Sequence, residues 1–395
     1  MSRMSRRATV AAAAVIGLGF FAIAGDLNPP AGPVAPTMKT LDEVEPRTAI
    51  NLTNTPGDAD SVYRITASGS YYLTGNITGQ AGKSGIEIAT SGVSIDLNGF
   101  ALIGVPGSVV GVVTVGTGLR DIAVRNGAAR EWGTTGVFLT SANSIVSHVT
   151  ASNNNLGGIA IGATGLVESC GAYFNGSDGI SVGNGCTVVD SVAGSNGASG
   201  IAGQFGVTVR GCSGYSNTGH GIAINSNAVI TECAATSNGA NGVHTASACQ
   251  ISSCSATGNG GHGIVSSNDG MVINNTCRTN VGDGINAGSN NSILNNNCGL
   301  NGFSAGDGAG IHTTNSDNRI EGNNCADNDR GIDVDFTGSM ILRNTCSGNS
   351  TNYDIAANNR FGEIVSIPAS GTGAVLGSSA AGTLTTTDPW ANFSY

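Results

Sequence analysis

The sequence is poor in charged and aromatic residues. Only 11% of its 395 residues are Asp, Glu, Lys or Arg, against roughly 25% in ordinary soluble domains, and only 5% are aromatic. Lysine occurs only as Lys39 and Lys83. The formal net charge is −10, which is opposite to the basic surface that nucleic acid requires, so we expect no nucleic-acid partner. The scarcity of charge also argues against a helical bundle or an ordinary α/β enzyme.

Long hydrophobic runs are also lacking, except at the start of the chain. Three arginines within the first seven residues precede an apolar run over residues 8–24, which ends in small residues. This pattern predicts a secretory signal peptide over residues 1–24. The run is shorter than the roughly 20 residues of a spanning helix, so an uncleaved anchor is the less favoured alternative. We therefore expect an exported protein, periplasmic, cell-surface or extracellular, without stable membrane insertion.

Proline is infrequent and concentrated. Four of the nine prolines lie within residues 25–36, which predicts an extended linker after the signal peptide.

Glycine, by contrast, is abundant and periodic. The chain contains 62 glycines, and Gly-Ile or Gly-Val pairs recur seven times at a spacing of 21 residues. These glycines are Gly158, Gly179, Gly200, Gly221, Gly242, Gly263 and Gly284. Related pairs on either side bring the count to thirteen copies. An asparagine column with the same spacing runs from Asn154 to Asn301.

Each copy holds three short apolar pieces separated by Asn, Ser and Gly, which favour turns. No single copy can bury its apolar face, but stacked copies can. The sequence thus predicts an all-β fold: a single right-handed parallel β-helix, a three-sheet solenoid of about 13 coils over residues 85–360. Residues 37–84 are expected to form an N-terminal cap with the first strands, and residues 361–395 a C-terminal cap. We interpret the asparagine column as a structural ladder of stacked amides.

The ten cysteines follow the same period. Eight of them are expected to point inward, and parallel side chains on adjacent coils keep Cβ atoms farther apart than disulfides prefer. We therefore predict buried free thiols; coil-to-coil disulfides are the alternative. No CxxC pair or Cys/His spacing typical of zinc is present. The sequence predicts no metal and no cofactor.

A family resemblance rests on these coils. The segment IEGNNCADNDRGI (320–332), with SIDLNGFALIG (94–104) and IAVRNG (122–127), resembles the right-handed parallel β-helix proteins of the pectin-lyase-like superfamily. The resemblance covers about residues 60–360 and implies that fold. It implies no single activity, because the superfamily holds lyases, hydrolases, epimerases, phage tailspikes and non-catalytic members. The catalytic signatures of its galacturonan hydrolases, pectate lyases and alginate epimerases are absent from this sequence.

A candidate site lies where polar residues gather beside the repeated glycine. His220 and His262 precede that glycine by one residue, whereas His244 and His312 follow it by two. Stacking should place His312 next to Asp333 on the following coil, with the insertion 301–310 nearby. The candidate catalytic residues are Asp307, His312, Arg330, Asp333 and Asp335. The candidate binding residues are His220, His244, His262, Asp283 and Phe303.

Imidazole and carboxylate groups beside a long loop are the ingredients of an acid/base sugar site. Exterior turns must be polar in any case, however, and a histidine metal site is the least favoured reading. We therefore expect a non-enzymatic or cryptically enzymatic module that interacts with polysaccharide or the cell surface, and a monomer. The alternative is a polysaccharide lyase, hydrolase or epimerase. A second alternative is a purely structural envelope protein.

Overall fold

The computed structural model describes residues 46–302, 308–366 and 386–395. The predicted signal peptide (1–24), the linker (25–36), and the candidate residues Phe303 and Asp307 lie outside the described residues. The described part of the chain is all-β, with strands β1 to β42 and no helix. Accordingly, none of its elements is a helix long and apolar enough to cross a membrane.

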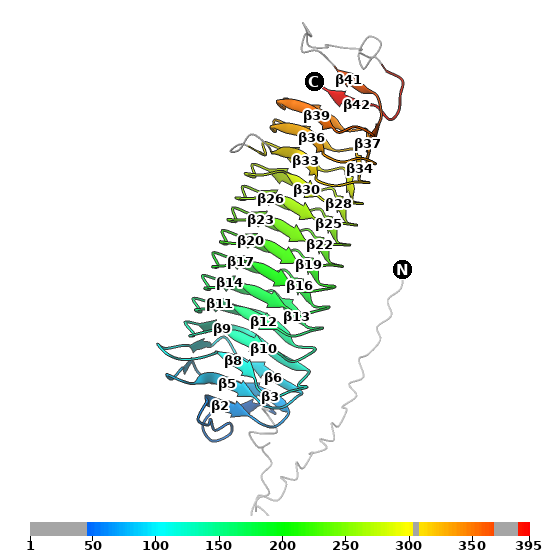
Figure 1. Cartoon of the computed structure of the whole chain (residues 1–395). Helices are drawn as coiled ribbons and strands as arrows, with labels where there is room; N and C mark the ends of the chain where they lie inside the picture. The colour runs from blue at the N-terminus through cyan, green and yellow to red at the C-terminus, as the bar shows by residue number, and fades with distance from the viewer. Residues whose placement is uncertain (1–45, 303–307, 367–385) are drawn as a thin grey trace, which may run out of the picture. The chain divides into compact units, whose positions relative to one another are not determined.

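One continuous parallel sheet runs the length of the stack (Figure 1). Its fourteen strands are β2 (Ser61–Ile65), β5 (Ser84–Ile88), β8 (Val112–Thr114), β10 (Val137–Leu139), β12 (Ile159–Ile161), β15 (Ile180–Val182), β18 (Ile201–Gly203), β21 (Ile222–Ile224), β24 (Val243–Thr245), β27 (Ile264–Ser266), β30 (Ile285–Ala287), β33 (Ala309–Thr313), β36 (Arg330–Val334) and β39 (Thr351–Ile355).

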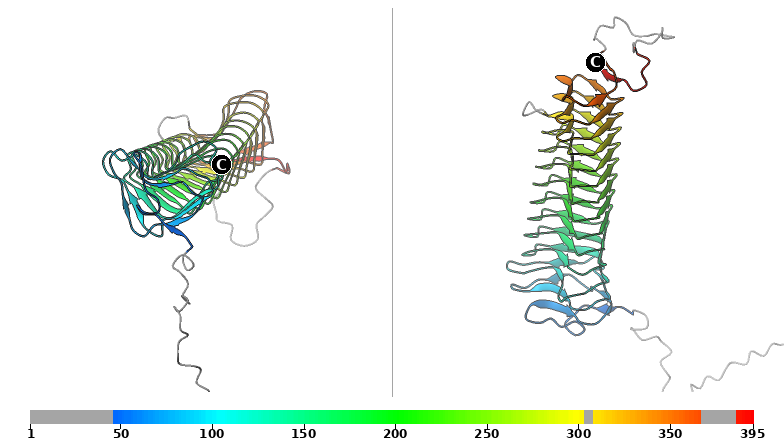
Figure 2. Two further views of the ribbon diagram at one scale, coloured as in Figure 1. Left: turned by 90° about the horizontal axis from the view of Figure 1, so that it is seen from below. Right: turned by 45° about the vertical axis from the view of Figure 1, so that its right-hand side comes forward.

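The other two strands of each coil form two further parallel stacks (Figure 2). One contains β1 (Thr48–Ala49), β3 (Gly69–Tyr72), β6 (Val93–Asp96), β13 (Leu166–Glu168), β16 (Thr187–Val189), β19 (Thr208–Arg210), β22 (Val229–Thr231), β25 (Gln250–Ser252), β28 (Met271–Ile273), β31 (Ser292–Leu294), β34 (Arg319–Glu321), β37 (Met340–Leu342) and β40 (Arg360–Phe361). The other contains β4 (Ile77–Thr78), β7 (Ala101–Ile103), β14 (Gly171–Tyr173), β17 (Val192–Gly194), β20 (Ser213–Tyr215), β23 (Ala234–Thr236), β26 (Ser255–Thr257), β29 (Thr276–Arg278), β32 (Asn297–Gly299), β35 (Asn324–Ala326), β38 (Thr345–Ser347), β41 (Ile364–Ser366) and β42 (Asn392–Ser394).

Two long strands join these stacks. β9 (Ile122–Arg130) and β11 (Ile145–Ser152) each run through the corner without a break and pair with strands of both stacks. The predicted three sheets are therefore one separate sheet and two stacks that merge near the N-terminal end.

The described residues form about fifteen coils, slightly more than the expected thirteen: the continuous sheet has fourteen strands, and the stack from β1 to β40 has fifteen when β9 and β11 are counted. The fourteenth strand of the continuous sheet is β2, which pairs in parallel with β5, Tyr63 lying opposite Ile86. Its sequence SVYRI has no Gly-Ile or Gly-Val pair, so a count based on that pair misses it.

Each coil bends at residues with a left-handed backbone. Ser169 (φ 52°), Asp190 (φ 49°) and Glu232 (φ 57°) occupy one such corner on different coils. A single left-handed residue between extended ones turns the chain sharply, and polar or small residues tolerate that region best. The corner that these residues form separates the two merged stacks.

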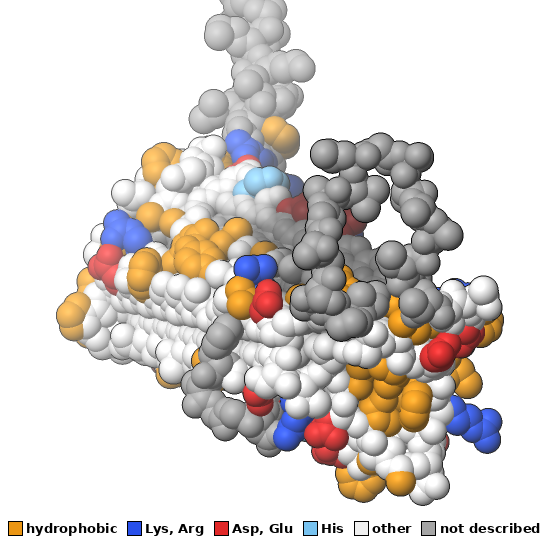
Figure 3. Space-filling view, turned by 90° about the horizontal axis from the view of Figure 1, so that it is seen from above, with side chains coloured by type: hydrophobic (Ala, Val, Ile, Leu, Met, Phe, Trp, Pro, Cys, Tyr) orange, Lys and Arg blue, Asp and Glu red, His pale blue; other side chains and the backbone are white. Residues whose placement is uncertain are grey.

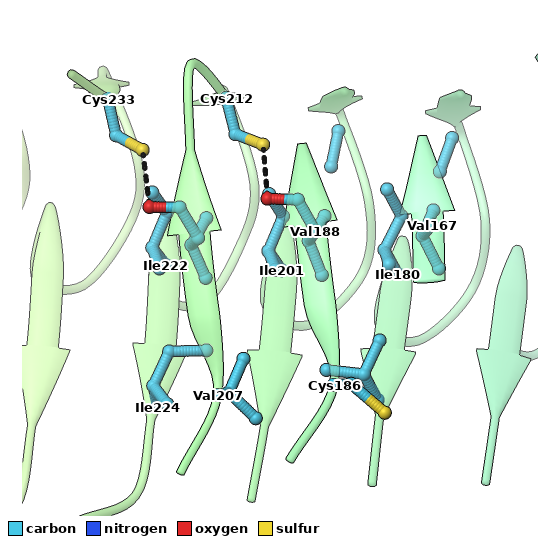
Figure 4. Packing of buried hydrophobic residues seen from close by; sticks show 14 of the residues in the cluster. Val167, Ile180, Cys186, Val188, Ile201, Val207, Cys212, Ile222, Ile224 and Cys233 are labelled. Carbon is cyan, nitrogen blue, oxygen red and sulfur yellow. Dashed lines mark hydrogen bonds between the residues drawn. The ribbon is translucent and has the colours of Figure 1, made fainter. Parts of the chain in front are cut away.

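The interior is a set of aliphatic and cysteine columns (Figure 4). Ile180, Ile201 and Ile222 lie opposite one another on consecutive coils and are fully buried. All ten cysteines are buried and unbridged, as predicted. Their thiols are not isolated, because Sγ of Cys212 donates to the carbonyl of Val188 at 3.5 Å, and Sγ of Cys233 on the next coil makes the same contact with the carbonyl of Val209 at 3.7 Å.

The asparagine ladder is present and explains the glycine column. Nδ2 of Asn217 donates to Oδ1 of Asn238 at 3.0 Å, and the backbone N–H of Asn217 donates to the same oxygen at 3.1 Å. A Cβ atom on Gly221 would lie 2.7 Å from Nδ2 of Asn238. The two columns share one period because the amide of each coil occupies the space that the glycine of the preceding coil leaves open.

The C-terminal residues add to the end of the stack. β42 pairs in parallel with β38, and Asn344 donates from Nδ2 to Oδ1 of Asn392, which extends a second asparagine ladder. Phe393 thus pairs with Thr345 at the end of the stack. Trp390 remains exposed, with the guanidinium of Arg343 4.0 Å from its ring centre.

Candidate functional site

Four of the five predicted catalytic residues lie near the C-terminal end of the continuous sheet, namely His312, Arg330, Asp333 and Asp335; Asp307 lies outside the described residues. His312 on β33 lies directly opposite Asn286 on one side and Asp333 on the other. Its neighbours Ile311 and Thr313 point inward and are fully buried. The strand alternation therefore directs the imidazole outward. The predicted pairing of His312 with Asp333 across adjacent coils is confirmed.

The imidazole of His312 is held between carboxylates. Its Nδ1 lies 3.2 Å from Oδ2 of Asp283, and its Nε2 lies 3.1 Å from Oδ2 of Asp335. The distance from Nε2 to Oδ2 of Asp333 is 3.9 Å, which is too long for a hydrogen bond. The spacing of adjacent coils would allow a hydrogen bond between His312 and Asp333, but none forms here. Side chains directly opposite one another on parallel strands project side by side. The His312 ring therefore extends beyond the Asp333 carboxylate and contacts Asp335 instead.

Asp283 is the buried anchor of this group. Its Oδ1 accepts the backbone N–H of Ala309 at 2.8 Å, and its Oδ2 accepts Nδ2 of Asn286 at 2.7 Å. Burial alone would raise the pKa of Asp283, but the hydrogen bonds of this carboxylate outweigh burial and hold the pKa well below its usual range. Sequence reasoning missed Asn286, although its place in the column of His312 was a signal.

These contacts make His312 a cation at neutral pH. Burial lowers its pKa, but the carboxylates of Asp283, Asp335 and Asp333 outweigh burial and raise the pKa to about 9. A protonated imidazole cannot serve as a general base. The raised pKa therefore disfavours proton abstraction by His312, and a ligand at Nε2 would have to displace the proton on that nitrogen.

Asp333 is more enclosed than the sequence predicted. Their spacing of two residues predicts that Asp333 and Asp335 face solvent together, but this is wrong: the side chain of Asp333 is 5% exposed, whereas that of Asp335 is 46% exposed. Nη1 of Arg330 donates to Oδ2 of Asp333 at 2.6 Å and, with His312, covers it. Asp335 escapes burial because it follows the last residue of β36. Burial raises the pKa of Asp333, against the opposing effect of Arg330.

The remaining predicted binding histidines have partners within the fold. The backbone N–H of Asn241 donates to Nδ1 of His220 at 3.1 Å, and that of Asp283 donates to Nδ1 of His262 at 3.0 Å. Because Nδ1 of His262 accepts a hydrogen bond, this nitrogen carries no proton. Nδ1 of His262 lies 3.1 Å from Oδ2 of Asp283, but without a proton on Nδ1 this contact is not an ion pair. His244 stacks on His220 with ring centres 4.7 Å apart. Burial lowers the pKa of both of these rings.

A second surface was not predicted from the sequence. A shallow groove of about 560 Å³ follows the corner between the two merged stacks across consecutive coils. Its lining includes Ser213, Glu232, Ser255 and Thr276. Tyr215, two residues after Ser213 on β20, stands beside the groove and is 37% exposed.

The ring of Tyr215 lies flat on the preceding coil. A Cβ atom built on Gly194, which pairs with Tyr215, would lie 2.4 Å from Cζ of the tyrosine and 2.7 and 2.8 Å from two further ring atoms. The ring of Tyr215 therefore occupies the space that a side chain at position 194 would fill. Tyr173 folds over Gly171 in a similar way. Gly171, however, lies on the same strand as Tyr173, whereas Gly194 lies on the coil before Tyr215; for Tyr215 the signal in the sequence was a glycine 21 residues earlier, in the same column.

The sequence and the structure both match known β-helices. The family model of the right-handed β-helix region matches residues 135–276 and 200–350, which together span more than half of the chain. This chain is a member of the right-handed β-helix family. A comparison with curated proteins finds no match.

Two solved structures are similar to this β-helix. The A-module of the Azotobacter vinelandii mannuronan C-5 epimerase AlgE4 has 17% identity and a TM-score of 0.53, covering 74% of this chain and 90% of that module. The A-module of the epimerase AlgE6 from the same organism has the same identity and TM-score, covering 74% of this chain and 89% of that module. At this identity the likeness is one of fold.

The surface of the β-helix is mainly neutral. In the view of Figure 3 the charged side chains stand as small separate groups among hydrophobic side chains and white atoms, which are other side chains and backbone. The groove beside Tyr215 offers hydroxyl groups and an aromatic face, whereas the group around His312 offers an imidazole and several carboxylates. The first arrangement is suited to binding an uncharged ring, and the second to holding a cation.

Proposed function

We propose that this β-helix is an exported protein that binds an extended, neutral polysaccharide along the groove beside Tyr215. The observation that carries the proposal is the exposed Tyr215 ring, held flat over Gly194 at the edge of a straight groove. The predicted signal peptide supports a periplasmic, cell-surface or extracellular location. N-terminal sequencing of the exported protein should find a new terminus near Gly25.

The groove has the chemistry that a sugar chain requires. An aromatic ring presented by its face gives an apolar platform for the C–H side of a pyranose, worth about 0.5–1.5 kcal/mol beyond its area. Ser213, Ser255 and Thr276 line the groove with groups that donate and accept hydrogen bonds. Adjacent coils are about 4.8 Å apart, close to the length of one sugar unit, so successive coils can meet successive sugars.

The charge of the groove selects the class of glycan. Glu232 is the charged residue of its lining, and the protein as a whole is acidic. A polyanionic chain would be repelled, so we expect neutral glucans, mannans, xylans or chitin chains to bind more tightly. The similar solved structures are named as epimerases of mannuronan, which is a polysaccharide but an anionic one, so they support a polysaccharide ligand and not its neutral charge.

Affinity electrophoresis through gels that contain each polysaccharide tests the proposal. Tyr215→Ala should weaken binding to the retained polysaccharide by about tenfold, because it removes the stacking face. Gly194→Val should weaken it similarly, because its side chain displaces the ring while leaving Tyr215 in place. The matched control is Tyr395→Ala, which removes an exposed tyrosine at the C-terminus. Equal retention of Tyr215→Ala and wild type would refute the proposal.

The enzymatic alternative rests on a separate observation. His312, the buried Asp333 and the exposed Asp335 place their polar atoms within 4.8 Å of one another, which brings two carboxyl groups of different environment together. The same polysaccharides should therefore be assayed for new reducing ends and unsaturated products. We expect no turnover; turnover that is lost in Asp335→Asn would replace the binding proposal with an enzyme. A chain that neither binds nor turns over any polysaccharide would be a structural envelope protein.

A further inference from the structure

We infer that His312, Asp333 and Asp335 form a binding site for one divalent transition-metal ion, with Asp283 as the residue that positions His312. This inference does not rest on the proposed polysaccharide binding, which involves a different face. It revises the expectation of no metal site, which came from the lack of a local Cys/His spacing. The three ligands instead come from β33 and from the end of β36.

The ligand atoms are spaced as a shared ion requires. Nε2 of His312 lies 3.1 Å from Oδ2 of Asp335 and 3.9 Å from Oδ2 of Asp333. With metal–ligand distances of about 2.0–2.2 Å, two ligands of one ion are at most about 4.2 Å apart. Small rotations of the exposed Asp335 are enough to bring all three atoms onto one centre, since the whole set lies within 4.8 Å.

The opposite nitrogen of the imidazole is fixed in the manner of metal-binding histidines. Such histidines usually donate their other ring N–H to a carboxylate, which fixes the tautomer and the orientation of the ring. Here Nδ1 of His312 faces Asp283, whose side chain is 3% exposed. Asp283 is itself held by the backbone N–H of Ala309 and by Asn286. This buried carboxylate leaves Nε2 aimed at Asp333 and Asp335.

The surroundings of the three ligands favour an ion that keeps some coordination positions free for water. Arg330 contacts Asp333 through Nη1 and Asp354 through Nε, so it balances part of the negative charge beside the ligands. The exposed side of Asp335 leaves room for water to complete the coordination. An imidazole nitrogen with carboxylates suits Zn²⁺ and related first-row ions better than Ca²⁺ or Mg²⁺, which prefer oxygen alone.

Equilibrium dialysis of Zn²⁺ against the full chain, prepared without a histidine tag, tests the site. We expect one tightly bound Zn²⁺ per chain and much weaker binding of Ca²⁺. Asp335→Asn should weaken Zn²⁺ binding by at least about 100-fold, because it removes a ligand, and Asp283→Asn by about 10- to 100-fold, as for other residues that orient a ligating histidine. Asp335 is exposed, so its variant should keep the circular dichroism spectrum of the wild type.

His244→Gln is the matched control. His244 occupies the column of His312 on an earlier coil, but its ring contacts His220 and Asn241 and no carboxylate. Its replacement should leave Zn²⁺ binding unchanged. Absence of stoichiometric Zn²⁺ binding by the wild type would overturn the inference. So would Zn²⁺ binding that Asp335→Asn leaves intact, or Ca²⁺ binding tighter than that of Zn²⁺.

Discussion

Replacing Asn238 with alanine should show how much the asparagine ladder stabilises the fold. Asn238 is 2% exposed and sits mid-stack. Its Oδ1 accepts both the backbone N–H and Nδ2 of Asn217, and its Nδ2 donates to Oδ1 of Asn259 and to the carbonyl of Gly214. The alanine variant loses all four bonds at once.

The cost follows from the groups left without partners. Nδ2 of Asn217 still donates to the carbonyl of Ala193, and Oδ1 of Asn259 still accepts the backbone N–H of residue 238. The backbone N–H of Asn217 loses its only ladder acceptor. Each buried donor or acceptor left unpaired costs about 1–3 kcal/mol, so we expect Asn238→Ala to lower the free energy of unfolding by about 2–5 kcal/mol.

Urea unfolding followed by circular dichroism measures this loss. Asn225→Ala is the control, since Asn225 lies on a neighbouring turn with one exposed side-chain hydrogen bond, and it should cost below about 1 kcal/mol. In a repeat protein each coil contacts mainly its neighbours, so hydrogen exchange should accelerate first in the coils around Asn217 and Asn259. Equal stability of Asn238→Ala and Asn225→Ala would refute the reasoning that buried amide ladders hold adjacent coils together.

Three further predictions concern other parts of the fold. The pKa of His312 is raised from 6.5 to about 9, so its stabilisation is complete below pH 6.5 and is lost as the pH rises through about 9. Urea unfolding at a series of pH values should show that the free energy of unfolding falls by up to about 3 kcal/mol over this range, and that His312→Gln abolishes the fall. A free energy of unfolding that does not change with pH in the wild type would disprove the ion-pair assignment. Ellman's reagent should modify no cysteine in the folded protein and all ten after denaturation, whereas a shortfall after denaturation would reveal disulfides. Gly85→Ala places a Cβ atom 2.5 Å from the carbonyl oxygen of Gly111 and 2.8 Å from the buried ring of Trp132. The substitution should therefore lower the free energy of unfolding by about 1–3 kcal/mol. Gly75→Ala, which meets nothing within 4 Å, should cost far less, and thermal melts of both variants compare them.

Much of this architecture was predictable because it depends on one number, the length of the repeat. Once copies stack in register, residues 21 positions apart become neighbours, so like residues must meet. The amide contacts of Asn217 with Asn238 and the burial of Cys212 and Cys233 follow directly. The strand β2 falls within the first strands expected over residues 37–84, but the count of coils left it out because it lacks the Gly-Ile or Gly-Val pair.

The candidate sites depend on distances between side-chain atoms, which the repeat length does not specify. Asp283 reaches His312 across 29 residues and the insertion between their coils, and a side-chain reach of this kind depends on rotamers and burial rather than on period. The period placed Tyr215 and Gly194 side by side, but only the folded chain laid the ring flat over the glycine. The repeat alone therefore determined which backbones are neighbours, whereas packing decided which side chains bond to one another and which remain open to a ligand.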